Sequence, residues 1–107
     1  MAQMKPKKIV FMFLGHGADP TKHRATLSLD SMELIVVGVP NYDQAVKVSK
    51  ELVKEGVRAF ELCGGFGNIG VGKIAEAVKG VPIGVVRFDM HPAAQGKTGD
   101  QMAGLTP

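Results

Sequence analysis

A repeated unit of helix, glycine and buried strand restricts the fold of this chain more than any other feature. Each unit has an amphipathic helical stretch that ends at a glycine, Gly56 or Gly80, followed by a valine and an apolar run at residues 57–63 or 82–89. Glycine commonly ends a helix because it adopts left-handed backbone angles without strain. Alternation of this kind is typical of βα repeats, so we expect strands that pair in parallel.

Two further apolar runs, residues 8–14 and 33–39, complete the expected sheet. Continuous apolar runs suit strands that are buried on both faces, as in parallel sheets. Between these runs, Asp19 followed by Pro20 has the pattern of an N-cap and a first helical position, which predicts a short helix within residues 18–32.

The expected architecture is a small α/β domain with a mostly parallel four-stranded sheet flanked by two or three helices, equivalent to half of a Rossmann fold. A chain of 107 residues allows one hydrophobic core, so we expect a single domain over residues 1–89. Residues 90–107 show almost no periodicity and predict a flexible tail or an arm that reaches a neighbouring subunit. Because two or three helices cannot cover both faces of a parallel sheet, we also expect a homo-oligomer.

Composition excludes several classes of protein. The net charge of +3 equals the contribution of Lys5, Lys7 and Lys8, and only 6% of residues are aromatic, so we expect no nucleic-acid partner. The single cysteine, Cys63, excludes an internal disulfide and any CxxC motif, which favours a reducing, cytoplasmic setting. The apolar run after the first lysines reads as a strand rather than a signal peptide. No run approaches the ~20 apolar residues that cross a bilayer, so no membrane partner is expected.

Polar residues follow each expected strand, at the edge where parallel α/β sheets bind their ligands. Loops are polar in any case, so this clustering alone does not establish a site. The residues in these positions are His16, Asp19, His23, Arg24, Asn41, Cys63, Asp89 and His91.

A glycine-rich loop at residues 64–70 is the main candidate for ligand binding. Gly65 to Gly70 matches G-x-G-x-x-G between a strand and a helix, but the chain lacks the second half of a dinucleotide-binding fold. Gly67 to Lys73 has Walker-like spacing, but Ile74 cannot supply the hydroxyl that a P-loop uses to bind magnesium. Free backbone N–H groups at a helix N-terminus favour an anion. The alternative is that the glycines only form a tight turn.

We therefore expect a small phosphate- or carboxylate-bearing metabolite where this loop meets the segment after the first strand. The sequence assigns no cofactor to this site. The expected ligand-binding residues are Asp19, His23, Arg24, Gly64, Gly65, Gly67, Asn68, Gly70, Lys73 and Arg87.

A second hypothesis is a thiol or acid–base enzyme. Cys63, at a strand end near a helix N-terminus, would act as nucleophile with His16 or His91 as base, and Glu61 would be the acid–base group. Glu61 and Arg87 are also expected to pair beneath the glycine loop, more simply as a structural ion pair. The alternative for Cys63 is a small buried apolar side chain. His16, Asp19 and His23 match no metal-binding signature, so no metal is predicted.

Two motifs carry a family resemblance. The stretches Gly17-Ala18-Asp19-Pro20 with His23-Arg24, and Glu61-Leu62-Cys63-Gly64-Gly65-Phe66-Gly67, resemble those of a family of small bacterial and archaeal proteins of unknown function. The resemblance spans residues 8–88 and implies no activity. The segment from Gly56 to Leu62 is also similar to one βα unit of class I aldolase-type barrels, although four strands cannot close such a barrel.

Three hypotheses about function stay open at this point. The first is a protein that binds an anionic metabolite, the second is the enzyme that uses Cys63, and the third is a homo-oligomeric assembly subunit without a ligand.

Overall fold

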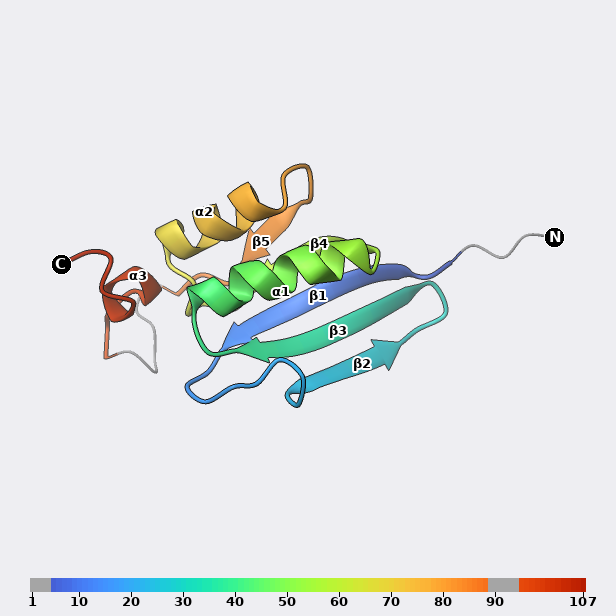
Figure 1. The fold of residues 1–107 in the computed structure, drawn as a ribbon, viewed down its shortest axis with the longest axis horizontal. Helices are drawn as coiled ribbons and strands as arrows, with labels where there is room; N and C mark the ends of the chain where they lie inside the picture. Colours follow the sequence, from blue (N-terminus) through green and yellow to red (C-terminus); the bar gives the residue numbers. More distant parts are fainter. Residues whose placement is uncertain (1–4, 89–94) are drawn as a thin grey trace.

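The computed structural model describes residues 5–88 and 95–107, and its centre is one five-stranded sheet (Figure 1). The strand order is β2-β3-β1-β4-β5; β1, β3, β4 and β5 are parallel, and β2 is antiparallel to β3. The mostly parallel α/β fold predicted from the sequence is therefore confirmed, with one strand more than expected. The elements are β1 (Lys7–Leu14), β2 (Arg24–Ser28), β3 (Met32–Val39), α1 (Tyr42–Lys54), β4 (Val57–Leu62), α2 (Asn68–Ala77), β5 (Ile83–Val85) and α3 (Gly99–Met102).

The prediction of a short helix within residues 18–32 is wrong, because this segment supplies the edge strand β2. Asp19 stabilises a tight turn and does not begin a helix. Its Oδ1 accepts hydrogen bonds from the backbone N–H of Thr21 (2.9 Å) and from the Thr21 hydroxyl (2.7 Å). The chain then runs back along β3 from Arg24, since the backbone of this short exposed segment gains ladder hydrogen bonds there.

Helices α1 and α2 lie on the same face of the sheet (Figure 1). The chain moves across the sheet in the same direction from β3 to β4 and from β4 to β5. Because both crossovers are right-handed, the helices in them, α1 and α2, lie on the same side of the sheet. The connection from β1 to β3 progresses in the opposite direction. A helix there would cover the second face, but the chain has β2 in its place.

The hydrophobic core lies between the sheet and these two helices. Strand side chains such as Val10, Met12 and Phe60 and helix side chains such as Leu52 and Ile74 are at most 1% exposed. Asn41 caps α1, since its side chain accepts a hydrogen bond from the Gln44 N–H (2.8 Å). None of the helices in the described part of the chain is long and apolar enough to span a membrane.

Candidate functional site

The carboxyl ends of β1, β3, β4 and β5 meet at one edge of the sheet, as their parallel pairing requires. α3, from the C-terminal segment, also lies at this end of the molecule (Figure 1). The candidate site is formed where α3, the glycine-rich loop and the residues after β5 come together.

The side chain of Asp100 is bound at the N-terminus of α2. Its Oδ2 accepts a hydrogen bond from the Ile69 N–H (2.8 Å), and its Oδ1 accepts from the Gly70 N–H (3.1 Å) and the Tyr42 hydroxyl (3.0 Å). Only 6% of Asp100 is exposed. A helix N-terminus favours a carboxylate because its first N–H groups have no partner within the helix and point toward the negative charge. α2 begins at Asn68, and Asp100 binds N–H groups of its first turn.

Tyr42 connects α1 to the same turn. Its hydroxyl donates to Asp100 and accepts a hydrogen bond from the Gly67 N–H (3.0 Å), and its ring stacks on Phe66 with the ring centroids 5.6 Å apart. Burial is the main cause that raises the pKa of Tyr42 to about 12. The hydrogen bond from the Gly67 N–H lowers this pKa, whereas the Asp100 carboxylate raises it. The phenol therefore stays protonated and keeps donating to Asp100 across the neutral range.

Close packing explains three of the glycines at this site. A Cβ at Gly67 would overlap the carboxylate of Asp100, a Cβ at Gly70 would overlap the ring of Tyr42, and a Cβ at Gly99 would overlap the backbone of Gly65. Each glycine thus permits contact between α2 or its loop and another part of the same chain. The expected approach of a ligand to the bare backbone is not needed to explain them.

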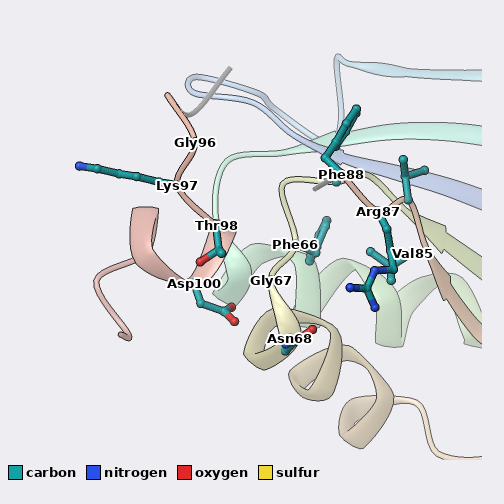
Figure 2. A pocket seen from close by; sticks show the side chains of 13 residues that line it. Phe66, Gly67, Asn68, Val85, Arg87, Phe88, Gly96, Lys97, Thr98 and Asp100 are labelled. Carbon is teal, nitrogen blue, oxygen red and sulfur yellow. The ribbon is translucent and has the colours of Figure 1, made fainter. Parts of the chain in front are cut away.

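A cavity of about 180 Å³ lies beside Asp100. Gly64, Phe66 and Asn68 line it on the side of the loop and α2, Arg87 and Phe88 line it after β5, and residues 96–100 close it. In Figure 2 the guanidinium of Arg87 points toward Asn68, while the side chain of Lys97 points away from the other lining residues. The N–H of Asn68 has no hydrogen-bond acceptor among the described residues, so the cavity borders an unused donor of the first turn of α2.

The predicted pair of Glu61 and Arg87 does not form. The two ion pairs found within residues 5–88 and 95–107 join Arg24 to Glu55 and Lys79 to Glu76. Glu61 lies opposite Gly84 in the parallel register of β4 and β5, whereas Arg87 follows the end of β5 and lines the cavity. The exposed Glu61 has water around it and needs no buried partner.

Arg24 does not reach the glycine-rich loop. Its guanidinium contacts the Glu55 carboxylate (3.0 Å) just after the last turn of α1, whereas Tyr42 places the glycine loop at the first turn of this helix. At a rise of 1.5 Å per residue, these two ends of α1 are separated by roughly 20 Å. The structure therefore does not bring Arg24 together with Gly67.

The segment between β1 and β2 stabilises its own turn. His23 Nδ1 accepts a hydrogen bond from the Asp19 N–H (2.8 Å), and the hydrogen bonds from Thr21 lower the pKa of the Asp19 carboxyl. His16 is exposed in this segment. Lys73 is exposed on α2, in a shallow groove between α1 and α2 and outside the cavity lining.

Cys63 lies directly after β4 and is partly buried. Its Sγ accepts a hydrogen bond from the Leu14 N–H (3.3 Å), and no hydrogen bond joins it to His16 in the described part of the chain. The other proposed base, His91, and Asp89, the polar residue that follows the last expected strand, lie outside the described residues. The enzyme hypothesis therefore stays a prediction. Within residues 5–88 and 95–107, no three His, Cys, Asp or Glu side chains gather where they could hold a metal ion.

Sequence reasoning missed Asp100 and Tyr42, the two side chains that organise the site. One local signal was present: Thr98 and Gln101 have capping-box spacing, and the structure shows both hydrogen bonds of that box at the start of α3. This signal predicts a helical turn around Asp100. It does not predict the contact of that turn with α2, which depends on the tertiary fold.

Comparison with known proteins places the chain in a family. A family model matches residues 7–101, and its description is a family of unknown function (DUF6506). The chain belongs to this family. The match to DUF6506 extends through α3 and therefore includes Asp100. No match was found among curated proteins or among solved structures.

Proposed function

We propose that the protein binds a small anion, a phosphate or a carboxylate, in the cavity between the glycine-rich loop, the residues after β5 and the α3 segment. The observation that carries this proposal is the guanidinium of Arg87, which points toward Asn68 (Figure 2), the residue whose backbone N–H has no acceptor among the described residues. A guanidinium and a helix N–H together suit phosphate and carboxylate oxygens.

The binding of the Asp100 carboxylate at the first turn of α2 supports the proposal. The same turn already binds the carboxylate of Asp100 through two backbone N–H groups, so its geometry suits such oxygens. Because Asp100 uses these donors, an external anion would depend on Asn68 and Arg87. The ligand would lie next to Asp100 and would not replace it.

The size of the cavity restricts the ligand class. A volume of about 180 Å³ is below the range of roughly 300–1,000 Å³ that is usual for drug-sized ligands. Inorganic phosphate or a short carboxylic acid is therefore a better candidate than a nucleotide.

A cytoplasmic location belongs to the same proposal, since the free thiol of Cys63 fits a reducing compartment.

Isothermal titration calorimetry with inorganic phosphate, acetate and short dicarboxylates tests this function. We expect binding of at least one of these anions to the wild-type protein, and affinity at least tenfold weaker, about 1.4 kcal/mol, in Arg87→Ala. Arg58→Ala is the matched control, because Arg58 is an exposed arginine on β4 outside the cavity lining, and its affinity should equal that of the wild type. Equal affinities in all three proteins, or no binding of any anion, would contradict the proposal.

A further inference from the structure

The face of the sheet opposite α1 and α2 is apolar and has no helix over it in the described part of the chain (Figure 1). The side chains of Val10 and Met12 point into the core, so the alternating residues of β1 point to the other face. The strand register aligns Ile9 with Leu34 and Phe11 with Val36 on that face.

Apolar side chains form a continuous area across four strands of this face, which we call the open face. They are all partly or largely exposed, and they belong neither to the core cluster nor to the side chains packed against it. The residues of the open face are Leu27 and Ala25 on β2, Leu34 and Val36 on β3, Ile9, Phe11 and Phe13 on β1, and Ala59 on β4.

A parallel sheet is normally covered on both faces, because each face carries side chains that gain stability when they leave water. Leu27 is 62% exposed, and the partly exposed ring of Phe13 lies over Gly38, where a Cβ would overlap it. Contiguous apolar areas of several hundred square ångströms mark interaction sites. The open face therefore calls for a partner.

We propose that a second copy of this chain covers the open face, in a face-to-face dimer with two-fold symmetry. The four strands are five to eight residues long and spaced about 4.8 Å apart, which gives a flat area of roughly 430 Å² per copy, or about 860 Å² for two. This total lies slightly below the roughly 1,000 Å² at which specific interfaces begin, so we expect a dimer of low affinity. An apolar sheet face packs against another apolar sheet face, and the open face of a second copy is such a surface.

The charges at the margin of the open face fit the same arrangement. Lys7 lies at the start of β1, and Glu61 lies on β4 opposite Phe11, so opposite charges stand on two sides of the apolar area. A two-fold axis between them places Lys7 of each copy across from Glu61 of the other. Two sheets packed in this way lie about 10 Å apart, with their side chains interdigitated.

Sedimentation velocity over a range of protein concentrations tests the proposal. We expect the wild-type protein to sediment as a dimer, and the variants Phe11→Asp and Ala59→Glu, each with a charge on the open face, to sediment as monomers. Met102→Asp is the matched control, since Met102 is an exposed apolar residue (62%) on α3, outside the open face, and this variant should stay dimeric. Circular dichroism checks that each variant has kept its fold.

Hydroxyl-radical footprinting of the wild-type protein gives a second measurement that needs no substitution. Protection of Phe11 and Phe13 should increase with protein concentration, while Met102 should react equally at all concentrations. A wild-type protein that is monomeric at every concentration would leave the open face to another occupant and overturn the proposal. A dimer that persists in folded Phe11→Asp and Ala59→Glu would overturn it as well.

Discussion

At the scale of single residues, Asp100 and Tyr42 hold the site together. Asp100 accepts three hydrogen bonds from two different helices and is nearly inaccessible to water. Removal of a buried acceptor leaves its donors without a partner, and each such donor costs free energy because it has lost water as well. The stability of the loop after β4 should therefore depend on one carboxylate from the C-terminal segment.

The substitution Asp100→Ala tests this dependence. It leaves the N–H groups of Ile69 and Gly70 and the Tyr42 hydroxyl without their acceptor, and we expect the free energy of unfolding to fall by about 2–4 kcal/mol. Asp43→Ala is the control, because Asp43 is an exposed acid in the first turn of α1 and should cost less than about 1 kcal/mol. Urea denaturation measures both values. Equal losses in the two variants would show that Asp100 is not a buried anchor.

The single tyrosine of the chain allows a direct test of the Tyr42 environment. Its pKa is raised from about 10 to about 12 in the folded protein, so between these values the unfolded state loses its proton first. The contribution of Tyr42 to stability is therefore fully present below pH 10 and is lost as the pH rises toward 12. We expect the absorbance of tyrosinate to appear near pH 12 in the native protein. A midpoint near pH 10 with the fold intact would contradict the buried hydrogen bonds.

At the scale of elements, α2 contains two glycines with opposite surroundings. A Cβ at Gly70 would overlap the ring of Tyr42, whereas a Cβ at Gly72 meets nothing within 4 Å. We expect Gly70→Ala to lower the melting temperature and to disturb the contact with Tyr42. Gly72→Ala should raise the melting temperature, because alanine stabilises a helix interior by about 0.5–1 kcal/mol relative to glycine. Differential scanning calorimetry compares the two variants, and the same sign for both would contradict the packing described for α2.

The sequence predicted those elements whose signals are local. The signals for the helix ends at Gly56 and Gly80 and for β1 and β3 all lie within a few residues of the structure they specify. β2 was missed because its five exposed residues have no apolar run, and its pairing with β3 is a tertiary contact. The Asp19-Pro20 pair resembles a helix start because the same carboxylate can cap a turn or a helix.

The candidate site was predicted only in part for the same reason. Arg87 and the loop around Gly67 line one cavity, as parallel strand ends require. Asp100 lies in a segment that the sequence assigned to a tail, and its partners are about thirty residues away along the chain. Such a contact leaves no periodic or local pattern in the sequence.

At the scale of the whole molecule, Asp100 of α3 is hydrogen-bonded to the first turn of α2. A protein that ends at residue 94 lacks α3, Asp100 and one wall of the cavity. We expect it to be at least as unstable as Asp100→Ala in urea denaturation and, if the proposed function is correct, to bind inorganic phosphate more weakly than the full chain does. Stability equal to that of the full chain would instead support the tail that the sequence predicted.

The proposed function depends on the binding of a small anion in the cavity between Arg87 and the first turn of α2. The most direct test is a titration of the ¹⁵N-labelled full-length protein with inorganic phosphate, followed by NMR of its N–H signals. We predict that the backbone signal of Asn68 and the side-chain Nε–H signal of Arg87 shift together along one saturable curve. Unchanged signals at these two positions at saturating phosphate, or shifts spread over the surface lysines alone, would contradict it.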